Sequence, residues 1–178
     1  VTTDDTAAAA AAVGYLADMG HKKIAVIGGE REYSDTGRLR YAGVLRALTE
    51  RGMTFDADRY YKTAHYSFDE GYTAMAELLR ETSEITAVFA MADVMAIGAA
   101  RAVRDAGKRI PEDISLIGFD GLPICRYYEP RLSTVTQRIA FMAEKSYAVL
   151  LDMIENGSGA QHVLAPYTLE KTDSIREN

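Results

Sequence analysis

Short runs of apolar residues, separated by segments with helical periodicity, most limit what this chain can fold into. Residues 24–27, 87–90 and 114–119 are apolar almost without interruption, which is typical of strands buried on both faces of a sheet. Between these runs, apolar residues recur every three or four positions, the spacing of an amphipathic helix. The alternation of strand and helix predicts an α/β fold, a doubly wound parallel sheet with helices on both faces.

Local signals indicate where the expected helices begin and end. Asp4 or Thr6 can cap the first helix, and Ser67 with Glu70 three residues later has the spacing of a capping box. Gly157 is expected to end the last helix. The helices are expected at residues 5–19, 36–52, 68–79, 93–106 and 139–155, and further strands at residues 1–3, 60–63, 133–137 and within 162–169.

The composition excludes several classes of protein. The 178 residues are 48% hydrophobic and carry a net charge of −6, so the chain can bury a core but lacks the basic surface that nucleic acid needs. One Cys and three His do not support a disulfide framework or a structural zinc site. No segment reaches the roughly 18 to 20 apolar residues of a membrane helix. We expect no metal, no cofactor and no membrane contact.

Polar side chains follow several of the expected strands, at the edge where ligands bind in such sheets. Arg40 can offer donors to a ligand or be a surface cation, and Tyr66 can stack on a ligand or cover the rim of the sheet. Asp120 can accept from ligand hydroxyls or cap a loop. Asp93 can also accept from ligand hydroxyls, although we expect it to cap its helix.

Catalytic motifs are not evident, so we expect no enzyme. The chain has no G-x-S-x-G elbow, and His21, His65 and His162 lie in predicted loops without a recognisable Ser or Cys partner. Cys125 lies beside Arg126 but is expected to be an ordinary small residue. The Gly28–Gly29 turn could cradle a phosphate at a helix N-terminus, but neither glycine-rich phosphate motif is present.

Four blocks of the sequence resemble the LacI/GalR family of bacterial transcriptional regulators. The blocks are GHKKIAVIGG at residues 20–29, RLRYAG at residues 38–43, PEDISLIGFD at residues 111–120 and PRLSTVTQ at residues 130–137. They occur in the family's order, and the resemblance covers the chain with almost no gaps. It implies a type I periplasmic-binding-protein-like core of two lobes, with a small-molecule effector between them and a helix-turn-helix domain before them.

The resemblance also implies how the chain is divided. Residues 1–131 resemble the second lobe, residues 132–158 a crossover strand and helix of the first lobe, and residues 159–178 a tail that returns to the second lobe. Because the chain opens on Val1, we expect the DNA-binding domain and most of the first lobe to be absent from it. The apolar stripe of the last helix is then expected to pair between chains or to dock on this lobe; it comprises Ile139, Met142, Val149, Leu150 and Met153.

The effector site implied by the resemblance uses five residues. They are Thr36, Arg40, Tyr66, Asp93 and Asp120. The residue before Asp93 is Ala92, where the family has a polar residue, which departs from the usual sugar-binding pattern. A guanidinium, a carboxylate and an aromatic ring suit vicinal hydroxyls, so we expect a pentose, a hexose or a related polyol.

The remaining expectations concern partners. The resemblance implies a cytoplasmic homodimer that binds operator DNA only through its N-terminal domain. The dimer contacts are expected at Met95, Ile97, Ala100, Tyr127 and Tyr128, although some of these could belong to the core. The alternative is a sugar-binding receptor of an ABC-type transporter, which would be monomeric and carry a leader; the blocks at residues 111–120 and 130–137 favour the regulator.

Overall fold

A six-stranded sheet forms the centre of the computed structural model, which describes residues 1–178. The strand order is β3-β2-β4-β5-β6-β8, and all neighbours are parallel except β6 and β8. The predicted α/β fold with a mostly parallel sheet is confirmed. The strands are β2 (Ile24–Gly28), β3 (Tyr61–Thr63), β4 (Ala87–Ala90), β5 (Ser115–Asp120), β6 (Ser133–Gln137) and β8 (Tyr167–Glu170).

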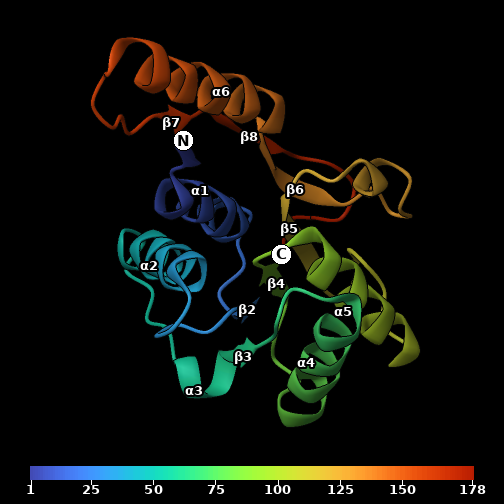
Figure 1. Cartoon of the computed structure of the whole chain (residues 1–178). Helices are drawn as coiled ribbons and strands as arrows, with labels where there is room; N and C mark the ends of the chain where they lie inside the picture. Colours follow the sequence, from blue (N-terminus) through green and yellow to red (C-terminus); the bar gives the residue numbers. More distant parts are fainter.

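Two pairs of helices cover the sheet, one pair on each face (Figure 1). The first pair is α1 (Asp5–Asp18) with α2 (Asp35–Thr49), and the second is α4 (Phe68–Glu81) with α5 (Asp93–Asp105). With both faces covered, every residue of β2 and β4 is buried, which is why these strands are apolar throughout. The sheet and its four helices therefore share one core.

The predicted helix ends are largely confirmed. Asp4 Oδ1 accepts from the Ala7 backbone N–H at 2.9 Å, and Ser67 Oγ accepts from the Glu70 N–H at 3.2 Å. Gly157, with φ 65°, follows the last helix. The Glu70 carboxylate does not complete a capping box, because it accepts from the backbone and ring of His65 instead. The short helices α3 (Ala57–Tyr60) and η1 (Pro123–Arg126) were not predicted.

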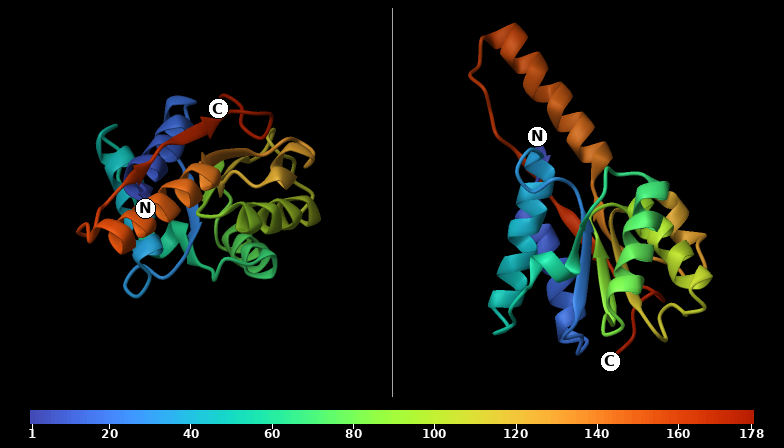
Figure 2. Two further views of the ribbon diagram at one scale, coloured as in Figure 1. Left: turned by 45° about the horizontal axis from the view of Figure 1, so that its top comes forward. Right: turned by 90° about the horizontal axis from the view of Figure 1, so that it is seen from below.

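The boundary expected after residue 131 does not coincide with the edge of the sheet. β6, the strand of the segment 132–158, pairs with β5 and β8 inside the sheet. Only α6 (Ile139–Asn156) leaves the body: none of its residues is buried, and it projects away from the lobe (Figure 2). Docking of α6 on this lobe is therefore not observed, and its place in another lobe stays a prediction.

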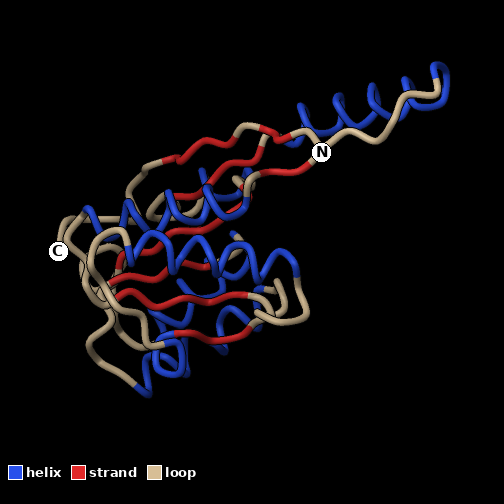
Figure 3. Tube along the Cα trace, turned by 90° about the vertical axis from the view of Figure 1, so that its left-hand side faces the viewer, coloured by secondary structure: helices blue, strands red, loops and turns tan.

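The chain termini lie at opposite ends of the body (Figure 3). At the base of α6, β1 (Thr2–Thr3) pairs in parallel with β7 (Leu164–Ala165). At the other end, the tail is tied to the sheet by His21, whose ring bonds Thr86 Oγ1 at 2.9 Å and the Arg176 carbonyl at 3.1 Å. The short strands expected within residues 162–169 are thus present as β7 and β8.

Close packing of α4 on α5 depends on glycine. A Cβ on Gly98 would overlap the carbonyl oxygen of Phe68, so an added methyl group must separate the helices. We expect Gly98→Ala to lower the free energy of unfolding by about 1–3 kcal/mol in urea titrations. The control is Gly159→Ala, where a Cβ meets nothing within 4 Å. Equal stability of the two variants would contradict this packing.

Candidate functional site

The carboxyl ends of the parallel strands bring polar residues from distant parts of the chain to one edge of the sheet. Asp120 is the last residue of β5 and Gln137 the last residue of β6. Arg40 reaches the same edge from α2, and Met91 follows β4 directly. This edge is the one at which ligands bind in open α/β sheets.

Arg40 is a buried, fixed cation at the centre of this edge. Its side chain is 6% exposed, its Nε donates to Asp5 Oδ1 at 2.7 Å, and its Nη1 donates to the Met91 carbonyl. The guanidinium carbon lies 3.6 Å from the centre of the Phe119 ring. The interpretation of Arg40 as a surface cation is therefore wrong. Its Nη2 lies 3.8 Å from Asp120 Oδ1, which leaves donor capacity at the edge itself.

Asp120 holds a partly exposed carboxylate at this edge. Its φ of 121° is rare for a residue with a side chain and indicates local backbone strain. Its Oδ1 accepts from Gln137 Nε2 at 2.8 Å, and Gln137 Oε1 accepts from Thr3 Oγ1 at 2.8 Å. Burial raises the pKa of Asp120, while Arg40 acts in the opposite direction. The side chain is still 31% exposed, so it can accept from a ligand.

Tyr66 and Thr36 flank Arg40. Tyr66 has φ 55° and is 37% exposed. Burial raises the pKa of its hydroxyl, although the positive charge of the nearby Arg40 acts in the opposite direction. Thr36 is half-buried in the first turn of α2, one helical turn before Arg40 and on the same face. A Cβ on Gly29 would lie 2.6 Å from Tyr66 Oη, so the Tyr66 side chain lies directly against the Gly28–Gly29 turn.

Asp93 has a different position from the one expected. Its side chain is fully buried, Oδ1 accepts from Thr134 Oγ1 at 2.6 Å, and Oδ2 accepts from the Leu122 N–H at 2.7 Å. It makes no cap bond, because Ala92 is the N-cap residue of α5. Burial raises its pKa to about 6. Asp93 therefore ties α5 to β6 and to the segment after β5, and does not face the edge.

The five expected dimer contacts fall into two groups, buried residues and residues that remain accessible. Met95 and Ala100 are fully buried in the core of this chain, so they are not available to a partner. Ile97 and Tyr128 are half-buried, with Arg104 stacked 4.8 Å from the Tyr128 ring centre, and Tyr127 is 88% exposed. The last three residues remain predicted contacts.

Three contributors to the edge were missed by sequence reasoning. Asp5, Gln137 and Phe119 hold Arg40 or Asp120 in place. Gln137 is the last residue of the PRLSTVTQ block, so the sequence did contain a signal that could have pointed to it. Asp5 lies 35 positions from Arg40, and no local pattern connects them. Cys125 is buried, and burial raises the pKa of its thiol, so it has the inert character expected.

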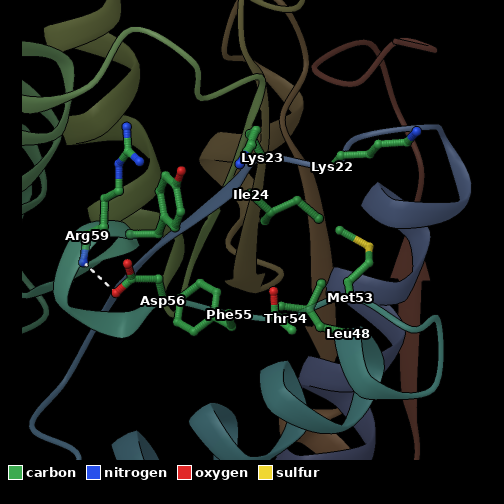
Figure 4. Close-up of a pocket in the computed structure, with 10 residues that line it drawn as sticks. Lys22, Lys23, Ile24, Leu48, Met53, Thr54, Phe55, Asp56 and Arg59 are labelled. Atoms are coloured by element: carbon green, nitrogen blue, oxygen red, sulfur yellow. Dashed lines mark hydrogen bonds between the residues drawn. The ribbon is translucent and has the colours of Figure 1, made fainter.

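Other features of the molecule lie away from this edge. A hollow of about 170 Å³ lies at the amino ends of the strands, between the start of β2 and the loop after α2 (Figure 4). No cluster of three or more potential metal ligands occurs. None of the helices combines the length and apolarity needed to cross a membrane.

Comparisons with known proteins place this geometry in a family. Residues 13–175 match the periplasmic binding protein-like domain family. An HTH-type transcriptional repressor PurR of Erwinia tasmaniensis is 40% identical over 164 residues, which cover 92% of this chain and 48% of that protein. The chain thus spans about half the length of the curated relatives it matches.

Solved structures agree with this placement. A putative LacI transcriptional regulator from Bacillus cereus subsp. cytotoxis superposes with a TM-score of 0.93 at 29% identity, covering 99% of this chain and 62% of that chain. A LacI family regulator from Enterococcus faecium with bound ribose has a TM-score of 0.90 at 32% identity, covering 99% and 65%. These relatives are transcriptional regulators and not enzymes. The chain belongs to the periplasmic binding protein-like domain family and, within it, to the effector-binding domains of LacI-type regulators.

Proposed function

We propose that this chain senses a small, neutral, polyhydroxylated molecule, a sugar, for a repressor of transcription. The observation that carries the proposal is the pairing of Arg40 with Asp120 beside the half-exposed ring of Tyr66. A sugar hydroxyl can accept from the guanidinium and donate to the carboxylate, while the ring covers the C–H face. A bound ribose in one structural neighbour supports this ligand class.

The charges at the edge favour a neutral ligand. Arg40 is the buried cation of this edge, and it faces two carboxylates, Asp5 at 2.7 Å and Asp120 at 3.8 Å. The three groups together carry a net negative charge. A sugar phosphate or a carboxylate would meet uncompensated repulsion in a partly buried setting, where charges interact more strongly than in water. A neutral polyol would meet no such repulsion.

The regulatory part of the proposal concerns the whole protein. As a repressor in the cytoplasm, it would be a homodimer through surfaces that include Ile97, Tyr127 and Tyr128, with operator DNA bound by a separate domain. Ligand binding would change how the dimer holds DNA, a coupling that is typically about 1–3 kcal/mol. The repressor relatives favour this function over a transport receptor.

The test is calorimetry on the intact protein with ribose, glucose, cellobiose, ribose 5-phosphate and hypoxanthine. We expect a neutral sugar to bind and ribose 5-phosphate to bind more weakly or not at all. Asp120→Asn should weaken sugar binding about tenfold or more, because one charge-assisted hydrogen bond is lost, which corresponds to about 1.4 kcal/mol. The control is Asp35→Asn, whose partner is the exposed Arg38. Binding of hypoxanthine with no sugar signal would contradict the proposed ligand class.

A further inference from the structure

The hollow at the amino ends of the strands has the size of one ring. It lies between Ile24, the first residue of β2, and Tyr60, which directly precedes β3. Its volume is about 170 Å³, and an apolar protein cavity of about 150 Å³ is known to hold benzene. It lies at the edge of the sheet opposite to Arg40 and Asp120, so it is separate from the effector site proposed above.

The lining combines an apolar floor with a cationic rim (Figure 4). The floor consists of Ile24, Leu48, Met53, Phe55 and Tyr60. The cations are Lys22, Lys23 and Arg59. Half of the ten lining residues are hydrophobic, and small-molecule sites usually combine apolar side chains with a few convergent polar groups.

The cations of the rim outnumber the carboxylates. Lys23 and Arg59 share a single partner, Glu84, with Lys23 Nζ 3.4 Å from its carboxylate. Asp56 is engaged by the N-terminus of α3, where its Oδ1 accepts from the Arg59 backbone N–H at 3.3 Å. Lys22 is exposed and has no carboxylate within 4.0 Å. In a chain of net charge −6, this local excess of positive charge favours an anion.

A row of aromatic rings connects the hollow to the opposite edge. The ring centres of Tyr60 and Phe55 are 6.5 Å apart, those of Phe55 and Tyr41 6.2 Å, and those of Tyr41 and Tyr61 5.4 Å. The Tyr61 hydroxyl donates to the Gly29 carbonyl, beside Tyr66. Tyr41 directly follows Arg40 on α2. Packed side chains of this kind can carry coupling between two sites.

We propose that this hollow is a second ligand site, for a small aromatic carboxylate, and that its occupation alters the effector edge through the aromatic row. The ring enters the apolar floor, and the carboxylate meets Lys23 and Arg59, the two cations that already approach one carboxylate, Glu84. The binding half stands on the hollow alone, whereas the coupling half rests on the proposed function of the Arg40 edge. By reciprocity, effector binding changes the affinity of the hollow by the same factor.

The experiment is NMR of the chain with ¹³C-methyl-labelled methionine, titrated with benzoate. Met53 lines the hollow, and Met91 lies at the effector edge, with its sulfur 4.0 Å from Tyr61 Oη. We expect the Met53 signal to move saturably, Met91 to move with the same midpoint, and Met153 on the projecting α6 to stay in place. No movement of Met53 in millimolar benzoate overturns the proposal.

Two variants separate the halves of the proposal. The double variant Lys23→Gln, Arg59→Gln should weaken benzoate binding at least tenfold while leaving weak binding of benzyl alcohol unchanged; the control Arg101→Gln, in an exposed pair on α5, should change neither. Equal loss for both compounds overturns recognition of the carboxylate.

Phe55→Leu tests the coupling half. This variant should abolish the Met91 response while Met53 still responds. A Met91 response that survives in Phe55→Leu overturns coupling through the row, and the sugar titration described above is unaffected by either result.

Discussion

Replacing Arg40 by methionine is expected to lower the free energy of unfolding by about 3–5 kcal/mol, the usual loss when one partner of a buried ion pair is removed. Methionine fills similar space against Phe119 but leaves the Asp5 carboxylate and the Met91 carbonyl without their donors. Urea unfolding followed by circular dichroism measures the difference. Part of the loss should return in the double variant Arg40→Met, Asp5→Leu, because the orphaned carboxylate is then gone.

A matched control lies two residues earlier on the same helix. Arg38 pairs with Asp35 at 2.9 Å, and both side chains are exposed. Arg38→Met should therefore change the stability by at most about 0.5 kcal/mol. Similar losses in Arg38→Met and Arg40→Met would mean that the buried pair does not hold α2 to α1 as described.

The second large effect is expected at Asp93. Asp93→Ala leaves the Leu122 N–H and the Thr134 hydroxyl without their acceptor, and each buried unsatisfied group costs about 1–3 kcal/mol. We expect a loss of about 2–4 kcal/mol in urea titrations. Thr73→Ala is a suitable control, since that hydroxyl is exposed and bonds only the Asp69 carbonyl. A loss below about 1 kcal/mol for Asp93→Ala would show that water or a backbone shift replaces the carboxylate.

The same carboxyl group predicts a pH dependence of definite sign. Burial raises the pKa of Asp93 from 3.8 to about 6, so between these values the folded state binds a proton that the unfolded state has released. The stability contributed by Asp93 therefore falls as pH rises from about 4 to about 6. Asp93→Asn cannot ionise, so the wild type should lose about 2 kcal/mol relative to this variant between pH 4 and pH 7. A constant difference across this range would contradict a raised pKa.

The elements of the fold were predictable where local chemistry decides them. β2 and β4 are apolar throughout because helices cover both faces of the sheet. Asp4 and Ser67 were recognisable as caps because their partners lie three residues away. Helix α3, with four residues, is too short for periodicity to reveal it.

The site was predictable in its residue types but not in its connections. An exposed cation near the start of a helix is unfavourable, but Arg40 is buried against Phe119 and paired with Asp5, and these contacts are not visible in the local sequence. Asp93 was identified, but its role depends on Leu122 and Thr134, which belong to other elements. Such long-range pairings leave no trace in a local window of sequence.

The way α6 joins the body would give the proposed effector edge a mechanical output. The helix begins at Ile139, two positions after Gln137, whose amide holds Asp120, and Thr3 links the same amide to β1. With 18 residues, α6 is an arm of about 27 Å at 1.5 Å per residue. A rotation of about 10° at its base would move its tip by roughly 5 Å over that length. Under the proposed function, a ligand that displaces Asp120 would act at the base of this arm, where a small rotation becomes a larger displacement at the tip.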